Sequence, residues 1–158
     1  MDLILWRHAQ AHALASDAAQ DPAQDLARAL TPKGERQAER MAIWLNRRLA
    51  EATRILVSPA LRAQQTAQAL GRAYKTVDTI ATDAPVEALL QAARWPAGKD
   101  PVLLVGHQPT LGLLAAQLMA GQALPWSMRK GAVWWLRGRE QDGVLDVTLH
   151  AVQPPDFL

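Results

Sequence analysis

Four residues of the sequence combine chemical types that suit phosphoryl transfer. Arg7 and His8 follow a short apolar run, His107 follows a longer one, and Arg62 comes four residues after Ser58. A neutral imidazole can attack phosphorus and form a covalent phosphoimidazole, which splits hydrolysis into two easier steps. A guanidinium stays charged and donates paired hydrogen bonds that match phosphoryl oxygens. These residue types predict a nucleophile, His8, beside a phosphate pocket made by Arg7, Arg62 and His107.

Three apolar segments are placed to bring these residues together. Residues 3–6, 54–58 and 101–106 read as buried strands, and the candidate residues follow their carboxyl ends. In an open α/β sheet, ligands bind beyond the carboxyl ends of the strands. If the three strands are neighbours, both histidines and both arginines reach one pocket. His107 would then donate to a phosphoryl oxygen.

The other elements follow from periodicity and from helix-start signals. Thr31 and Pro32 have the residue types of an N-cap and a first helical position. The remaining expectations are a loop with a helical turn over 9–30, a helix from Ser58-Pro59 to about 73, a short strand over 76–80, a short helix or structured loop over 85–93, a helix over 109–119, a hairpin of strands 132–136 and 144–151, and an irregular tail from 153. Alternating strands and helices predict an α/β fold with a mostly parallel sheet covered on both faces, and the hairpin predicts an antiparallel edge.

Length and composition restrict the class of protein. The chain has 158 residues, which predicts one domain over 1–158. Its net charge of +2, from 17 basic and 15 acidic side chains without a long basic run, argues against a nucleic-acid or membrane patch. There is no cysteine, which excludes disulfides and thiolate chemistry and is compatible with a cytoplasmic protein. No carboxylate and histidine spacing matches a metal site, so no cofactor is expected.

Each candidate residue also has a purely structural interpretation. His8 and His107 could be hydrogen-bonded histidines at strand ends, and Arg62 could lie on a solvated helix face with Arg72. Ser58 fits a helix cap better than a phosphate ligand, although one hydroxyl could do both. Against these interpretations, two arginines near His8 would disfavour its imidazolium form and keep it nucleophilic.

Four stretches resemble the histidine phosphatase superfamily, which has the phosphoglycerate mutase-like fold. They are Leu5-Trp6-Arg7-His8-Ala9, Leu30-Thr31-Pro32-Lys33-Gly34, Val57-Ser58-Pro59-Ala60-Leu61-Arg62-Ala63-Gln64-Gln65-Thr66-Ala67 and Val105-Gly106-His107-Gln108-Pro109. They occur in the family's order, each at an expected strand–helix junction, and the likeness is greatest to the SixA-type phosphohistidine phosphatases. The resemblance implies a three-layer α/β/α sandwich, His8 as the nucleophile, Arg7, Arg62 and His107 as the phosphate pocket, and no metal.

Two features depart from the family pattern. The glycine that usually follows the Arg-His pair is Ala9 here, and an alanine would be strained at a positive φ. The general acid that many members carry before the long strand has Glu87 as its candidate, with Asp83 nearby. A phosphohistidine substrate has a good imidazole leaving group, so a strong acid is not required for it.

Three functions remain open on the sequence. The first is a phosphohistidine phosphatase that acts on a protein, because only 44 residues separate Arg62 from His107 and leave little chain to cap the pocket. The second is a phosphomonoesterase for small molecules, which a Glu87 carboxylate aimed into an enclosed pocket would favour. The third is a phosphate-binding module without turnover. The expected partner is thus a phosphorylated protein or a small phosphorylated substrate, and a monomer is expected.

Overall fold

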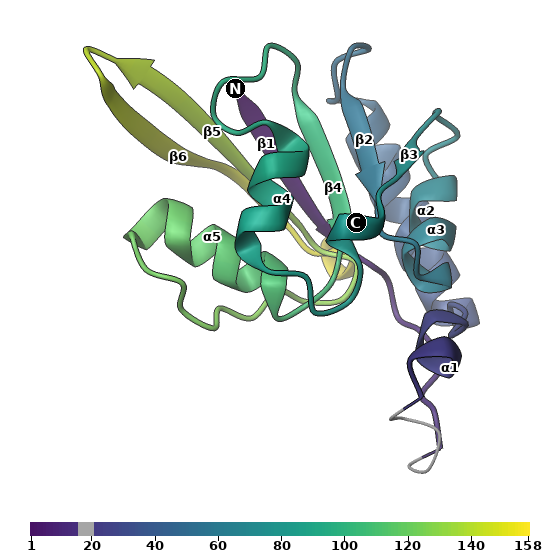
Figure 1. Cartoon of the computed structure of the whole chain (residues 1–158). Coiled ribbons are helices and arrows are strands. Elements are labelled where there is room, and N and C mark those ends of the chain that lie inside the picture. The colour runs from purple at the N-terminus through teal and green to yellow at the C-terminus, as the bar shows by residue number, and fades with distance from the viewer. Residues whose placement is uncertain (16–20) are drawn as a thin grey trace.

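A six-stranded sheet runs through the molecule and positions the candidate residues. The computed structural model describes residues 1–15 and 21–158. Its strands are β1 (Asp2–Arg7), β2 (Arg54–Val57), β3 (Lys75–Thr76), β4 (Val102–Gly106), β5 (Val133–Gln141) and β6 (Val144–Gln153). Their order in the sheet is β3-β2-β4-β1-β5-β6 (Figure 1). The first four strands of this order pair in parallel, and β5 and β6 pair antiparallel, so the expected parallel sheet with an antiparallel edge is confirmed.

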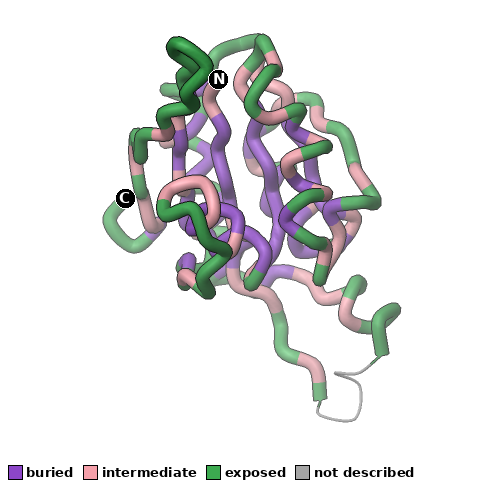
Figure 2. Tube along the Cα trace, turned by 60° about the vertical axis from the view of Figure 1, so that its left-hand side comes forward, coloured by how far each residue is buried: buried purple, intermediate pink, exposed green. Residues whose placement is uncertain are grey.

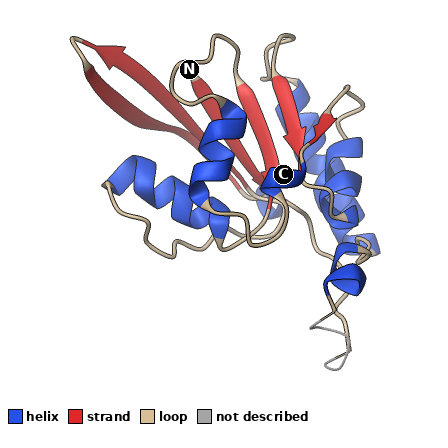
Figure 3. Cartoon of the chain, in the orientation of Figure 1, coloured by secondary structure: helices blue, strands red, loops and turns tan. Residues whose placement is uncertain are grey.

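Helices cover both faces of the sheet, as the expected three-layer α/β/α sandwich requires (Figures 1 and 3). The helices are α1 (Pro22–Leu26), α2 (Pro32–Asn46), α3 (Leu61–Gln68), α4 (Val86–Ala93) and α5 (Thr110–Ala120). Side chains of α2 and α3 pack against one face, and those of α4 and α5 pack against the other. Figure 2 shows the central strands buried between these layers.

Strand residues alternate between the two cores with the period of two that a strand imposes. On β1, Ile4 and Trp6 face α2 and α3, whereas Leu3 and Leu5 face α4 and α5. All four are fully buried, which is why the strand reads as one continuous apolar run.

The hairpin of β5 and β6 follows the same alternation. Trp135 packs in the core under α2 and α3, and its neighbour Trp134 packs at the opposite core. The expected pairing of two antiparallel strands is confirmed; β5 continues five residues past its predicted end, to Gln141, and β6 continues two, to Gln153. The extra length projects beyond the rest of the sheet (Figure 1).

The start of α2 forms as its residue types predict. Thr31 is the N-cap, and its hydroxyl accepts a hydrogen bond from the Gly34 N–H at 3.0 Å, while Pro32 takes the first helical position. Gly34 lies so close to Gln10 that a Cβ at this position would overlap the Gln10 carbonyl oxygen. The glycine therefore lets α2 reach the segment that follows His8.

Three local predictions need correction. The helix expected from Ser58-Pro59 begins at Leu61 and ends at Gln68, because Pro59 disfavours a helical Ser58 and Ala60 is extended at φ −61° and ψ 135°. The strand expected over 76–80 is a two-residue edge strand followed by a 3-10 turn, Asp78–Ile80. The tail ends in a further 3-10 turn, Pro155–Phe157.

The segment 9–30 contains the expected helical turn, which is α1. Residues 16–20 of that segment lie outside the described residues. Within the described ranges, no helix has the length and apolar character needed to cross a membrane.

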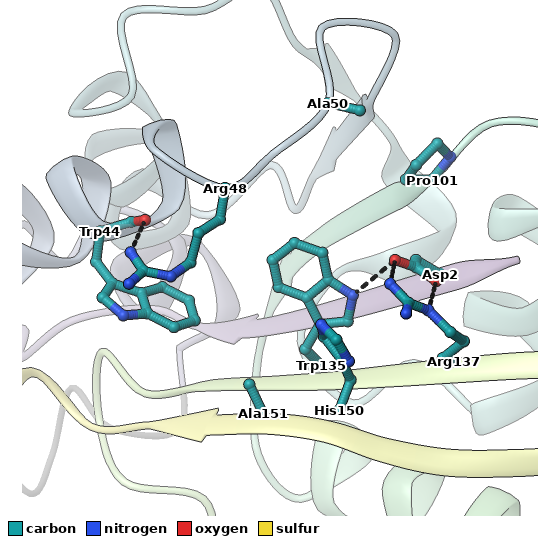
Figure 4. A pocket seen from close by; sticks show the side chains of 9 residues that line it. All are labelled: Asp2, Trp44, Arg48, Ala50, Pro101, Trp135, Arg137, His150 and Ala151. Carbon is teal, nitrogen blue, oxygen red and sulfur yellow. Dashed lines mark hydrogen bonds and ion pairs between the residues drawn. The ribbon is translucent and has the colours of Figure 1, made fainter.

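A shallow pocket lies at the amino end of β1, where the strand begins at Asp2 (Figure 4). Arg137 donates two hydrogen bonds to the Asp2 carboxylate, and the Trp135 indole N–H donates a third at 3.0 Å. Trp44 packs edge-on against Trp135 with 6.5 Å between ring centroids, and the Arg48 guanidinium lies over Trp44. These contacts join α2 to the sheet at the opposite end of β1 from His8.

Candidate functional site

The carboxyl ends of three adjacent strands bring the candidate residues together. In the pairing of β1 with β4, Arg7 lies opposite Gly106, and the His8 N–H donates to the Gly106 carbonyl at 3.0 Å. On the other side of β4, the Ser58 N–H donates to the Val105 carbonyl at 3.1 Å. The rings of His8 and His107 are 5.2 Å apart between centroids. The sequence expectation that these strand ends are neighbours is therefore met.

His8 is a neutral imidazole with a defined tautomer. Its Nδ1 lies 2.8 Å from the Ala9 carbonyl oxygen, which can only accept a hydrogen bond, so Nδ1 carries the proton. Burial above all, and then the charges of His107, Arg62 and Arg7, lower the pKa of His8 to about 3, although the hydrogen bond to Ala9 acts in the opposite direction. The lone pair is thus on Nε2 at neutral pH. Burial contributes more to this state than the arginines on which the sequence interpretation relied.

His107 lies against Ser58 in the interior. The His107 Nε2 and the Ser58 Oγ are 2.6 Å apart, and both residues are buried. Burial lowers the pKa of His107 to about 4, with Arg62 adding to the effect. The other ring nitrogen, Nδ1, is buried and has no hydrogen-bond partner among the described residues.

Arg62 is buried and held from one side. Its Nη1 donates to the Asp25 backbone carbonyl at 2.7 Å, and its Nη2 lies 3.2 Å from both the Asp25 carboxylate and the Thr82 hydroxyl. Arg7 is held in a similar way, since its Nη1 donates to the Met128 carbonyl at 2.7 Å. Burial lowers the pKa of both guanidinium groups.

The Nε atoms of Arg7 and Arg62, like the His107 Nδ1, are buried without a partner in the described part of the chain. A buried donor left unpaired costs about 1–3 kcal/mol, so native proteins rarely leave several together. Here the three nitrogens belong to residues that influence the pKa of His8. An anion bound beside His8 would supply the missing acceptors and offset the buried positive charge.

The backbone around the nucleophile is fixed by its neighbours. The Ala9 N–H donates to the Thr66 hydroxyl on α3 at 3.0 Å, and Ala9 is fully buried against Leu30 and Ala38. Ala9 is not among the residues with a positive φ. The alanine that replaces the family's glycine is therefore accommodated without backbone strain.

Comparison with known proteins agrees with this geometry. The model of the histidine phosphatase superfamily (branch 1) matches residues 3–90, more than half of the chain. The chain belongs to this superfamily. The phosphohistidine phosphatase SixA of Escherichia coli is 34% identical over 105 residues, which are 61% of this chain and 65% of that protein. The match thus spans less than two thirds of that relative.

Solved structures extend the superfamily likeness to almost the whole chain. The protein histidine phosphatase SixA complexed with tungstate is 27% identical, with a TM-score of 0.76 and coverage of 99% of both chains. A structure described as a putative phosphohistidine phosphatase SixA from Agrobacterium tumefaciens is also 27% identical, with a TM-score of 0.75 and coverage of 98% of this chain and 97% of that one. These likenesses confirm the phosphoglycerate mutase-like fold expected from the motifs.

Glu87, the general acid suggested by the superfamily resemblance, is not joined to the pocket. It lies exposed in the first turn of α4, and no hydrogen bond or ion pair connects it to the described pocket residues. Its role stays a prediction. Among the described residues, the Asp25 carboxylate does contact a pocket residue, Arg62, and it also pairs with Arg28 at 3.1 Å.

Sequence reasoning missed Asp25 because its contact with Arg62 crosses 37 positions of the chain. The available signal was local and weak. Asp21 and Pro22 mark a helix start, and the spacing of Asp25 and Arg28 suits a pair on one helical turn. Neither feature says which distant residue this helical turn would contact.

Ser58 is not the N-cap that the sequence suggested. Ala60 takes that position without a side-chain cap bond, and the Ser58 hydroxyl instead accepts the Ala60 N–H at 3.3 Å and contacts His107. Among the described residues, no group of three or more His, Cys, Asp or Glu side chains could hold a metal ion.

Proposed function

We propose that this protein is a phosphatase that transfers the phosphoryl group of its substrate to His8 and then to water. One observation carries the proposal: a neutral imidazole with its lone pair on Nε2 lies beside three buried nitrogens that lack partners in the described part of the chain. Superfamily membership and the likeness to SixA proteins agree with it.

The first step forms a bond between His8 Nε2 and phosphorus while the bond from phosphorus to the leaving group breaks. The leaving group departs with that electron pair and takes up a proton from water. The Ala9 carbonyl accepts the Nδ1–H and stabilises the positive charge that develops on the attacking ring. Arg7, Arg62 and His107 bind the peripheral oxygens, whose charge needs stabilising throughout the transfer.

The second step returns the enzyme to its starting state. A water oxygen bonds to phosphorus, the Nε2–phosphorus bond breaks, and inorganic phosphate leaves. His8 is released as a neutral imidazole, as its lowered pKa favours. No metal is assigned a part, and activity in the presence of EDTA stays a prediction.

For the substrate, we propose phosphohistidine on a protein. The imidazole leaving group of phosphohistidine does not need a strong acid, which fits a pocket to which Glu87 is not joined. The 44-residue connection from Arg62 to His107 contains the rest of α3, the short strand β3, one 3-10 turn, the short helix α4 and strand β4, and no added domain. The relatives named as phosphohistidine phosphatases support the same class. Monomeric state and a cytoplasmic location, the latter suggested by the absence of cysteine, stay predictions.

The decisive experiment is capture of the intermediate. The protein is mixed with a 32P-phosphohistidine protein, quenched in alkaline SDS to preserve phosphoimidazole, and mapped by peptide mass spectrometry. Label is expected on the peptide containing His8, and His8→Ala should abolish both label and turnover. Turnover that survives in His8→Ala would refute the mechanism.

The competing function, a phosphomonoesterase for small molecules, is separated by comparing substrates. Glu87→Gln should leave phosphohistidine turnover unchanged if no acid is needed. A phosphomonoesterase that depends on Glu87 would lose most of its kcat in the same variant. If the enzyme turns over small phosphomonoesters faster than the phosphorylated protein, then small phosphomonoesters and not protein phosphohistidine are its substrate class.

A further inference from the structure

The hydroxyl of Ser58 has a role that the phosphate pocket does not account for. It lies 2.6 Å from the His107 Nε2, inside the protein, and is fully buried. A neutral histidine has one N–H, and the hydrogen bond made by one ring nitrogen determines which of the two carries it. The partner of Nε2 therefore decides whether Nδ1 is a donor or an acceptor.

The contacts of Ser58 decide between the two tautomers. Its oxygen already accepts the Ala60 N–H at 3.3 Å, and its hydroxyl hydrogen has no other acceptor among the described residues. If Nε2 carried the proton, the Ser58 hydrogen would have no acceptor, and the buried Nδ1 would present a lone pair to the pocket. If Ser58 donates to Nε2, its hydroxyl both donates one hydrogen bond and accepts one, and the ring proton of His107 is on Nδ1.

The second arrangement also matches the charge of the ligand. The His107 Nδ1 is buried and has no partner within residues 1–15 and 21–158, and the same holds for the Nε atoms of Arg7 and Arg62. A lone pair at Nδ1 would repel a phosphoryl oxygen, whereas an N–H would donate to it. The Nδ1–H tautomer thus makes all three unpartnered nitrogens donors.

We propose that Ser58 is a positioning residue that donates to His107 Nε2 and so fixes the Nδ1–H tautomer that faces the phosphoryl group. The inference deepens the proposed function and rests on it for the identity of the ligand. The tautomer itself is a property of the free protein. It can therefore be measured whether or not the protein is a phosphatase.

The primary test is a long-range 1H–15N correlation spectrum of 15N-histidine protein at pH 7. The chain has four histidines, so His107→Gln assigns the signals of this ring. His107 Nδ1 is expected at the shift of a protonated nitrogen and Nε2 at the shift of an unprotonated one. The reverse pattern in the wild-type protein would overturn the proposal, and this result does not require any variant of Ser58 to fold.

Variants of Ser58 connect the tautomer to turnover. In Ser58→Ala the His107 signals should move towards the Nε2–H form, and kcat should fall about 10-fold with a smaller change in KM, because a donor to the transition state is lost in part of the molecules. Ser58→Thr keeps the hydroxyl and should restore the Nδ1–H signals. A Ser58→Ala protein that is folded by circular dichroism and has unchanged His107 signals would contradict the role of Ser58. If the wild-type protein gives the expected spectrum but has no phosphatase activity, the proposed function is refuted. The tautomer assignment is then still supported.

Discussion

Acidification should destabilise the protein through two buried histidines. The pKa of His8 is lowered to about 3 and that of His107 to about 4, while an unfolded histidine titrates near 6.5. Between these values the unfolded chain binds protons that the folded chain does not. The contribution of the two neutral histidines to stability is therefore fully present above about pH 6.5 and is lost as the pH falls towards 4 for His107 and towards 3 for His8.

The size of the effect follows from the same pKa values. From pH 7 to pH 5, each histidine should lower the free energy of unfolding by about 2 kcal/mol, because one pKa unit corresponds to about 1.4 kcal/mol. The two together should lower it by about 4 kcal/mol, a large fraction of the 5–15 kcal/mol typical of a domain.

Urea unfolding at several pH values measures this loss directly. His8→Gln should remove about half of the decrease in the free energy of unfolding between pH 7 and pH 5, whatever the stability of the variant at pH 7. The control is His12→Gln, because His12 is an exposed histidine. If His8→Gln and His107→Gln both keep the wild-type pH dependence, then neither imidazole is buried in its neutral form and the argument for the nucleophile fails.

Three further outcomes are expected. Arg62→Lys keeps the charge but loses Nε–H and the planar fork, so kcat/KM should fall about 100-fold, whereas the same change at Arg72, whose guanidinium donates to Asn46 and Ala50 and not to a pocket residue, should have little effect on kcat/KM. Gly112→Ala places a Cβ onto the Trp126 carbonyl oxygen and should lower the free energy of unfolding by at least about 2 kcal/mol, measured by urea unfolding; Gly106→Ala, whose Cβ would meet Leu111 at an ordinary 3.7 Å, should cost less. Activity should be unchanged after dialysis against EDTA, and a loss that added Mg²⁺ restores would refute the metal-free mechanism.

The sheet and the meeting of the strand ends could be predicted from sequence because both depend on local patterns. The apolar run before His107 is buried on both faces, and Thr31 with Pro32 marks a helix start through its own backbone chemistry. Once β1, β2 and β4 are parallel neighbours, geometry alone brings His8, Ser58 and His107 to one edge.

The features that sequence missed depend on contacts between distant segments. The contact of Asp25 with Arg62 joins α1 to α3 across 37 positions, and the helix-cap interpretation of Ser58 ignored His107, 49 positions away. The dominance of burial in lowering the pKa of His8 was also missed, since exposure is a property of the packed molecule. These quantities require the tertiary arrangement itself.

The way in which the two arginines are held affects the entropy of binding. One terminal nitrogen of Arg7 donates to the Met128 carbonyl, and one of Arg62 donates to the Asp25 carbonyl, while the buried Nε atoms of both residues have no partner among the described residues. An arginine that must be immobilised by its ligand loses up to about 2 kcal/mol of rotamer freedom. In this protein that loss has already occurred during folding. A small inorganic oxyanion should therefore bind to a site that is already ordered. The affinity for the phosphoryl group should depend little on the larger molecule that carries it.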